Sequence, residues 1–293
     1  MKLEVFRNLF AAVGAAFFLL LLIVLLLAHF SGSRKFSNSD KVAVVKLEGV
    51  IIDPTEINEQ LREVGERDDV KAVVLRINSP GGAVGPSQEI YAEVQRLRKS
   101  KVVVASMGAV AASGGFYVAV ASNKIVANPG TITGSIGVIV EFVNAEELLA
   151  KLGIKGYVVK SGQFKDTGSP LRGMTDAEKK YLQALVNDVN GQFVRAVADG
   201  RNLKVEDVEK IADGRIFTGA QAKELGLIDS LGGLADSIDL SVRLAGLKGK
   251  PEIIYFEKKG FGWLRTLVDE SIARGIANLT GLRIMYLAPN PAM

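Results

Sequence analysis

From Lys41 onward, short apolar runs rich in β-branched residues alternate with segments of helical periodicity, and this alternation restricts the fold more than any other feature of the chain. Strands are predicted at residues 42–52, 70–77, 102–105, 125–127, 136–140 and 156–159. Helices are predicted between them, at residues 55–66, 87–99, 113–121 and 145–152. Such an alternation is typical of an α/β protein with a mostly parallel, buried sheet.

Beyond Thr175 the pattern changes to helix. Thr175 followed by Glu178 is the pattern of a capped helix start. A long helix is predicted there because apolar residues recur at every fourth position: Tyr181, Leu185, Val189, Phe193 and Val197. Shorter helices are predicted at residues 205–211, 219–225 and 234–245, and a strand at 253–256. Residues 263–282 form an amphipathic pattern that suits either a bilayer surface, a neighbouring subunit or the chain's own domain.

The N-terminal part of the chain has the composition of a membrane anchor. Residues 9–30 are almost entirely apolar and long enough for a helix that spans a bilayer, with Lys2 and Arg7 before them. A cleaved signal peptide is the alternative, but no clear cleavage site follows the run. We therefore expect a flank at 1–8, an anchor at 9–30, a linker at 31–40, a folded domain at 41–250, and a strand, helix and tail at 251–293.

Charge and composition restrict the chemistry. The net charge of +4 comes from 36 basic and 32 acidic residues spread along the chain, without the basic run that would track nucleic acid. The chain has no cysteine, and His29, its single histidine, lies inside the apolar N-terminal run. These absences exclude thiol nucleophiles, Ser-His-Asp triads and sites built on Cys or His metal ligands. A hydrolytic site would need Lys, Asp, Glu or an α-amine as its base.

Ser113 lies at the junction between a predicted strand and a helix of small residues, in the segment AASGG. Such a junction exposes a hydroxyl and directs backbone N–H groups toward one point, and the N–H of Gly114 is one candidate donor to an oxyanion. Read alone, the segment is equally consistent with a serine that only caps its helix.

Three further segments offer partners for Ser113. NSPGG follows a buried strand, and the N–H of Gly82 within it is a second candidate oxyanion donor. Lys165 lies in the loop SGQFKD, where Phe164 offers an apolar neighbour; a lysine becomes a base only where its surroundings lower its pKa from a reference of roughly 10.4. Ser135, in TGSIG, is a candidate to orient the lysine. Each segment by itself is also an ordinary turn or solvated loop.

In combination these segments resemble the signal peptide peptidase A family in its short form, membrane Ser-Lys peptidases of the S49 type related to the proteolytic subunit of Clp protease. NSPGG, AASGG, TGSIG, SGQFKD and DGRIFTGAQAKELGLID follow one another in family order between residues 41 and 247. The resemblance implies a Clp-protease/crotonase-like spiral of ββα units with a helical C-terminal part, after one N-terminal transmembrane helix. We interpret DGRIFTG itself as a turn and helix that pack on the sheet, without a catalytic role.

The resemblance also implies roles for the candidate residues. Ser113 is expected to be the nucleophile and Lys165 the general base, with Ser135 orienting the lysine and the Gly82 and Gly114 amides forming the oxyanion hole. No metal or other cofactor is expected. The substrates would be remnant signal peptides, cut in or near the cell (inner) membrane by a single-pass protein whose catalytic domain is on the extracytoplasmic side.

The same resemblance implies a homo-oligomeric ring in which Ser and Lys sometimes come from neighbouring subunits. Residues 287–293 are small and apolar, and we expect this tail to fit a neighbour's substrate groove. Three alternatives stay open: a membrane quality-control protease with other clients, a crotonase-like acyl-CoA enzyme, and a non-catalytic membrane scaffold.

Overall fold

The computed structural model describes residues 14, 17–23, 40–256 and 285–287. They belong to two units, Met1–Ser39 and Asp40–Met293. In the first unit, residues 14 and 17–23 are helical, and the rest of the predicted anchor at 9–30 lies outside the described residues. Among the positions that the structure describes, no helix has both the length and the apolar character that crossing a bilayer requires.

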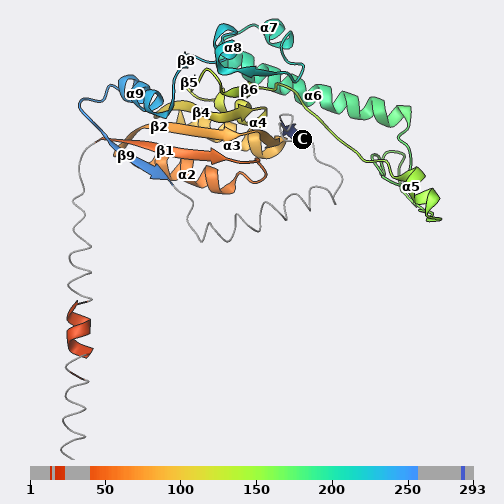
Figure 1. Ribbon diagram of the computed structural model, residues 1–293, viewed down its shortest axis with the longest axis horizontal. Coiled ribbons are helices and arrows are strands. Elements are labelled where there is room, and N and C mark those ends of the chain that lie inside the picture. The colour runs from red at the N-terminus through yellow and green to blue at the C-terminus, as the bar shows by residue number, and fades with distance from the viewer. Residues whose placement is uncertain (1–13, 15–16, 24–39, 257–284, 288–293) are drawn as a thin grey trace, which may run out of the picture. The chain divides into compact units, whose positions relative to one another are not determined.

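A sheet of eight strands organises the second unit (Figure 1). Its strands are β1 (Lys41–Glu48), β2 (Val70–Ser79), β4 (Val102–Ala112), β5 (Lys124–Ala127), β6 (Ile132–Gly134), β7 (Ile216–Thr218), β8 (Ser230–Leu231) and β9 (Glu252–Phe256). The order is β7-β6-β4-β2-β1-β9, and β5 joins β4 to β8. Every pairing is parallel except that of β6 with β7. The predicted α/β class with a mostly parallel sheet is therefore confirmed.

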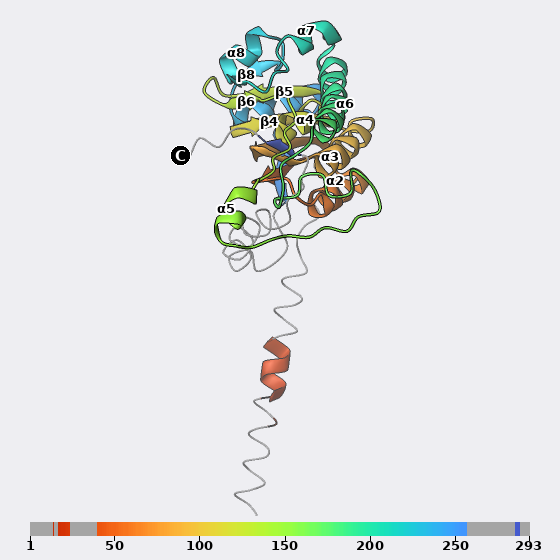
Figure 2. The ribbon, with the colours of Figure 1, turned by 90° about the vertical axis from the view of Figure 1, so that its right-hand side faces the viewer.

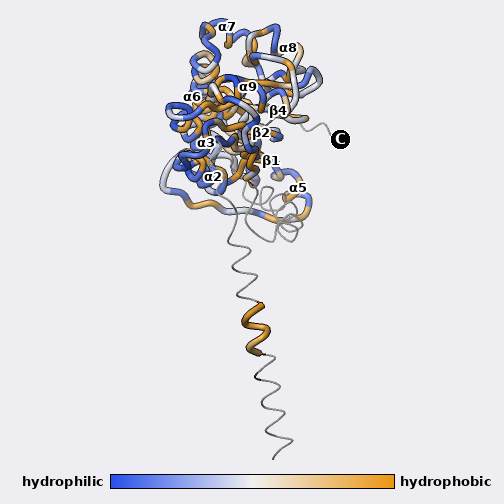
Figure 3. The backbone as a smooth tube through the Cα atoms, turned by 90° about the vertical axis from the view of Figure 1, so that its left-hand side faces the viewer, coloured by the Kyte–Doolittle hydropathy of each residue, from blue (hydrophilic) through white to orange (hydrophobic). Residues whose placement is uncertain are grey.

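Two apolar clusters cover the two faces of the sheet. Successive side chains of a strand point to opposite faces, so Ala43 and Val45 join one cluster while Val42 and Val44 join the other. The larger cluster includes side chains of α2 (Thr55–Glu66), α3 (Val84–Leu97), α4 (Gly114–Ala119) and α6 (Asp176–Arg201). The smaller one lies under α9 (Leu234–Leu244). Figure 3 shows the hydrophobic strands β1, β2 and β4 at the centre of this arrangement.

β4 has different neighbours along its length. Val104–Met107 pair with β5, whereas Val110–Ala112 pair with β6. Because β2 and β4 are parallel, their carboxyl ends meet at one edge of the sheet, where ligands usually bind in folds of this class. The NSPGG segment begins within the last two residues of β2, and Ser113 follows β4 directly.

Two predicted strands are wrong. The strand expected at 136–140 lies earlier, at Ile132–Gly134, because Gly134 (φ 74°) and Ser135 (φ 50°) turn the backbone out of the extended region. Residues 156–159 form no strand, since no neighbouring strand within the described residues pairs with them. The helix α6, with the capping box of Thr175 and Glu178, is confirmed. The helix predicted at 263–282 lies outside the described residues.

Residues 141–175, here called the arm, connect the sheet to α6 and contain α5 (Glu146–Lys151). In both Figure 1 and Figure 2, α5 lies apart from the sheet. The arm exposes a series of large apolar side chains: Val143, Leu148, Leu152, Ile154, Tyr157, Val158, Val159, Phe164 and Leu171. Such a concentration of exposed apolar side chains is typical of an interaction surface.

The remaining elements are short. α7 (Val205–Glu209) and α8 (Gly219–Glu224) follow α6, and a separate two-stranded sheet pairs β3 (Gly81–Ala83) with β10 (Met285–Leu287). β10 is antiparallel to β3, with residue 286 opposite Gly82.

Candidate active site

Ser113 connects β4 to α4 in a strained conformation. Its φ of 53° and ψ of −119° lie in a region that residues other than glycine rarely adopt. Such strain costs on the order of 1–3 kcal/mol and persists only where the surroundings impose it. Here the Ser113 N–H donates to the Gly134 carbonyl at 2.8 Å, and the Ser113 carbonyl accepts from the Tyr117 N–H at 2.8 Å. The sharp strand-to-helix turn resembles the elbow that presents nucleophiles in hydrolases.

The hydroxyl of Ser113 is buried without a partner. The residue has no exposed surface, and its Oγ makes no hydrogen bond. A buried hydroxyl without a hydrogen bond costs about 1–3 kcal/mol. Strain and a missing hydrogen bond thus occur at the same side chain, and such costs concentrate at functional sites.

The two predicted oxyanion glycines lie side by side. A Cβ placed on Gly114 would be 3.2 Å from the Gly82 N, 3.3 Å from the Gly81 Cα and 2.6 Å from the Ser87 Oγ. β3 is held in turn by Ile51, whose N–H donates to the Gly81 carbonyl at 2.9 Å and whose carbonyl accepts from the Ala83 N–H at 2.7 Å. The structure thus brings the backbones of Gly82 and Gly114 close together, and their oxyanion role stays a prediction.

Ser135 adjoins Ser113 through the neighbouring strand. It is 3% exposed and follows Gly134, whose carbonyl accepts the Ser113 N–H. The Ser135 N–H donates to the Arg215 carbonyl at 2.8 Å, so the DGRIFTG segment holds this serine in place through its backbone. Ile216–Thr218 of that segment form β7 and Gly219 begins the capped helix α8, so a short strand lies between the turn and the helix that were predicted.

Lys165 is not brought to Ser113 within one chain. It is exposed in the arm, and its neighbour Asp166 is tied through Arg172 to Glu178 in the first turn of α6. Phe193 lies roughly 22 Å beyond Glu178 along α6, at a rise of 1.5 Å per residue. The Phe193 ring packs on Tyr117, which lies one helical turn after Ser113. The Ser113 Oγ has no hydrogen-bond partner, so Lys165 does not contact it.

Phe164 does not dry a site around Lys165 in the isolated chain. Its ring packs on Tyr181, with 5.3 Å between the centroids, and 44% of its surface is exposed. Any enclosure of the lysine must therefore come from outside this chain or from a rearrangement of the arm.

A cluster of ions in the arm was not foreseen. The Arg172 guanidinium contacts the carboxylates of Asp166 and Glu178, and the Lys160 ammonium contacts Asp166 as well. Hydrogen bonds from Arg172 and Thr175 lower the pKa of the Glu178 carboxyl to about 2. Arg172 and Lys160 hold the pKa of Asp166 well below its ordinary range. Asp166, Arg172 and Glu178 are evenly spaced along the chain, and this alternation of charges is the sequence feature from which the cluster could have been predicted.

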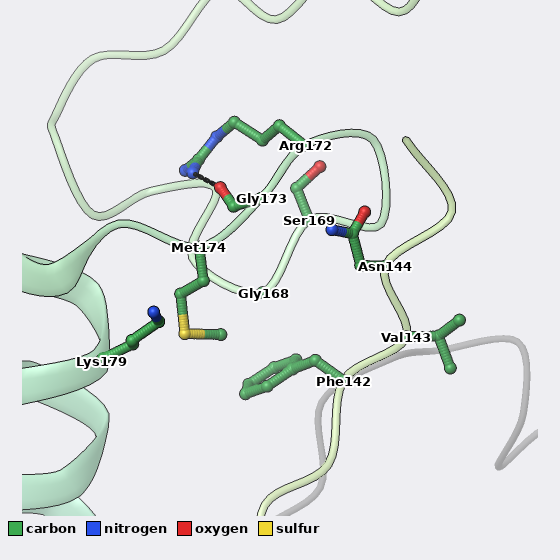
Figure 4. A pocket seen from close by; sticks show the side chains of 9 residues that line it. All are labelled: Phe142, Val143, Asn144, Gly168, Ser169, Arg172, Gly173, Met174 and Lys179. Carbon is green, nitrogen blue, oxygen red and sulfur yellow. Dashed lines mark hydrogen bonds between the residues drawn. The ribbon is translucent and has the colours of Figure 1, made fainter. Parts of the chain in front are cut away.

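Arg172 also lines a cavity of about 450 Å³ in the arm (Figure 4). The cavity lies between residues 142–144, 168–169 and 172–174, with Lys179 at the first turns of α6. Its lining contains none of the residues predicted for catalysis. Among the residues described by the structure, no group of three or more His, Cys, Asp or Glu side chains is arranged to hold a metal ion.

Comparisons with known proteins agree with the motifs. The sequence profile of peptidase family S49 matches residues 95–248, and that of Clp protease matches residues 41–131. A "putative protease" of Synechocystis sp. is 48% identical over 215 residues, which cover 73% of this chain and 77% of the relative. The "putative signal peptide peptidase SppA" of Enterococcus faecium is 38% identical over 217 residues, 69% of this chain and 63% of that protein. "Protease 4" of Salmonella typhi is 36% identical over 71% of this chain and 35% of its own length.

Proposed function

Because this chain belongs to peptidase family S49, we propose that it is a serine endopeptidase in which Ser113 is the nucleophile and Lys165 the general base. The observation that carries the proposal is the Ser113 hydroxyl, which is buried, without a hydrogen bond and held in a strained turn. A serine that only capped its helix would require neither a strained backbone nor a buried hydroxyl without a hydrogen bond.

The mechanism follows from the groups around Ser113. Its Oγ attacks the peptide carbonyl while neutral Lys165 takes the hydroxyl proton. The N–H groups of Gly82 and Gly114 stabilise the oxyanion, and Ser135 orients the lysine. The lysine then protonates the leaving amine and activates the water that hydrolyses the acyl-enzyme. No metal or cofactor takes part in these steps.

The dyad forms between two copies of the chain in a ring-shaped homo-oligomer. Support comes from the separation of Lys165 and Ser113 within one chain and from the apolar surface of the arm, which carries Lys165. An arm that docks on the next copy covers its exposed apolar side chains and presents Lys165 to the neighbour's Ser113. The same contact desolvates the lysine, which favours its neutral form.

Substrates are extended apolar peptides, with remnant signal peptides as the main class. β10 pairs antiparallel with β3, with residue 286 opposite Gly82, so a substrate strand that takes the place of β10 at this edge runs past the Gly82 amide. One relative is named a signal peptide peptidase. Residues 288–293 of the tail lie outside the described residues, so whether they reach a neighbour's groove stays a prediction.

The domain organisation belongs to the same proposal. Residues 9–30 anchor the chain in the inner membrane and 31–40 link the anchor to a Clp-like domain at 41–250 on the extracytoplasmic side, followed by the C-terminal part at 251–293. An enzyme tethered there meets apolar peptides where they partition. The quality-control alternative differs only in its clients, whereas family membership speaks against a crotonase-like acyl-CoA enzyme.

The test uses the full-length chain in detergent with a metal chelator and a fluorogenic signal-peptide-like substrate. We expect Ser113→Ala and Lys165→Ala to be inactive, and a mixture of the two, exchanged into common oligomers, to regain activity. The mixture pairs an intact Ser113 with an intact Lys165 from another copy. Full activity of Lys165→Ala alone would remove it as the base, and two inactive variants that stay inactive on mixing would place the dyad within one chain.

A further inference from the structure

Arg172 links the loop that carries Lys165 to the start of α6. Its Nε and Nη2 donate to the two Asp166 carboxylate oxygens, each at 2.8 Å, and its Nη1 donates to Glu178 Oε2 at 2.9 Å. A further contact joins Nη2 to Glu178 Oε1. One guanidinium therefore makes a paired contact with each of two carboxylates, a geometry that the planar fork of arginine suits and a lysine ammonium cannot reproduce.

The Glu178 side of this link is rigid. The Glu178 side chain is 2% exposed, and its carboxylate also accepts from the Thr175 N–H at 2.8 Å as part of the capping box. The Thr167 hydroxyl donates to the same carboxylate at 3.3 Å. Because Glu178 belongs to a helix of 26 residues whose later turns pack in the core, it provides a fixed point for the loop.

The Asp166 side of the link is next to Lys165 in the chain. Asp166 is only 12% exposed, although it lies in a loop, and Lys160 pairs with it as a second cation. Consecutive Cα atoms are about 3.8 Å apart, so holding Asp166 also restricts the position of the Lys165 backbone. Turn hydrogen bonds from Lys165 N–H to the Gly162 carbonyl and from Thr167 N–H to the Phe164 carbonyl tighten the same loop.

We propose that Arg172 is a positioning residue for the peptidase reaction: by holding Asp166 against Glu178, it sets where the arm presents Lys165. This inference rests on the proposed role of Lys165 as the base. Figure 4 shows the Arg172 side chain folded back over its own loop, where it also donates to the Gly173 carbonyl at 2.9 Å.

The test compares Arg172→Lys and Asp166→Asn with the wild type, all as full-length protein in detergent. Arg172→Lys keeps the charge but loses the fork, and Asp166→Asn loosens the loop side while Arg172 still contacts Glu178. A misplacement of the base by about 1 Å costs on the order of a hundredfold in rate. We expect kcat to fall between about tenfold and a hundredfold in both variants, with KM unchanged because Lys165 acts in the chemical step.

Thr175→Ala is the matched control. It removes the hydroxyl that accepts the Glu178 N–H at 3.3 Å and donates to the Glu178 carboxylate at 3.0 Å, which weakens the helix start, but it removes none of the hydrogen bonds that Arg172 makes. We expect a lower Tm with kcat within about twofold of wild type. A purely structural role of Arg172 predicts the opposite pattern, in which kcat follows Tm in all three variants.

The outcomes separate this inference from the proposed function. If Lys165→Ala is inactive while Arg172→Lys and Asp166→Asn keep kcat within twofold of wild type, the positioning role is refuted and the dyad stands. If Lys165→Ala is active, the assigned base is wrong and the positioning role fails with it. If Arg172→Lys does not fold, Asp166→Asn alone decides between the two results, because it retains Arg172 and the capped helix.

Discussion

Replacing Gly114 by alanine tests the geometry of the proposed oxyanion hole most directly. The added Cβ would lie 2.6 Å from the Ser87 Oγ and 3.2 Å from the Gly82 N. Ser87 has no exposed surface and its hydroxyl donates to the Ala83 carbonyl at 2.8 Å, so it has little freedom to move away. The backbones of β3 and α4 must therefore separate by a sizeable fraction of an ångström.

That separation acts on the two proposed oxyanion donors together. Overpacking of this kind costs about 1–3 kcal/mol of stability. Loss of one well-placed donor lowers kcat on the order of a hundredfold or more. We expect Gly114→Ala to show both effects, with stability measured by urea denaturation and kcat by hydrolysis of the fluorogenic peptide.

Gly85 provides the matched control. It lies in the first turn of α3, and a Cβ there meets no atom within 4 Å. Gly85→Ala should leave kcat unchanged and stability unchanged or higher by up to about 1 kcal/mol. Adding Ser87→Ala to Gly114→Ala removes the nearest atom and should recover part of the lost rate. Wild-type activity in Gly114→Ala would refute the oxyanion assignment.

Three further predictions concern strain, packing and pH. Ser113→Gly removes both the strained side chain and the buried unpaired hydroxyl, so it should abolish activity yet raise the free energy of unfolding by about 1–3 kcal/mol in urea denaturation; a less stable variant would contradict the strain. Gly134→Ala places a Cβ 2.5 Å from the Phe217 Cδ2 at a φ of 74°, so it should lose about 1–3 kcal/mol by the same assay, and adding Phe217→Leu should recover part of the loss. Because Arg172 and Thr175 lower the pKa of Glu178 from an ordinary 4.5 to about 2, its ionised form stabilises the fold above pH 4.5, and this contribution is lost as the pH falls toward 2. The Tm advantage of the wild type over Glu178→Gln should shrink across that interval, and a constant difference would count against the pairing.

Much of the fold followed from local patterns. The strands β1, β2, β4 and β5 and the helix α6 were predicted near their observed positions, because hydrophobic periodicity and the Thr175 capping box are encoded within a few residues. The wrong strand at 136–140 has a local apolar pattern too, but left-handed residues just before it end the pairing. The run at 156–159 fails as a strand because strand formation depends on a partner.

The sequence predicted the residues of the candidate site better than their arrangement in space. The motifs identified Ser113, Ser135, Gly82 and Gly114, and the structure brings these four together around the ends of β2, β4 and β6. Lys165 was identified as well, and the resemblance allowed the serine and the lysine to come from neighbouring subunits, but the spacing along the chain did not indicate whether Lys165 meets Ser113 within one chain. Distances between loops depend on how the elements pack, which spacing along the chain does not encode.

By itself the sequence determined the class of fold, the family and the restricted chemistry of a chain with no cysteine and one histidine. These properties depend on which residues are present and in what local order. Only the tertiary structure decided that Ser113 is strained and unpaired, that the Gly82 and Gly114 backbones touch, and that Arg172 ties Asp166 to Glu178. The first two depend on contacts between segments distant in sequence, which exist only once the sheet and its helices have packed. The third depends on how the loop after Asp166 folds back on the start of α6, which the local sequence pattern does not encode.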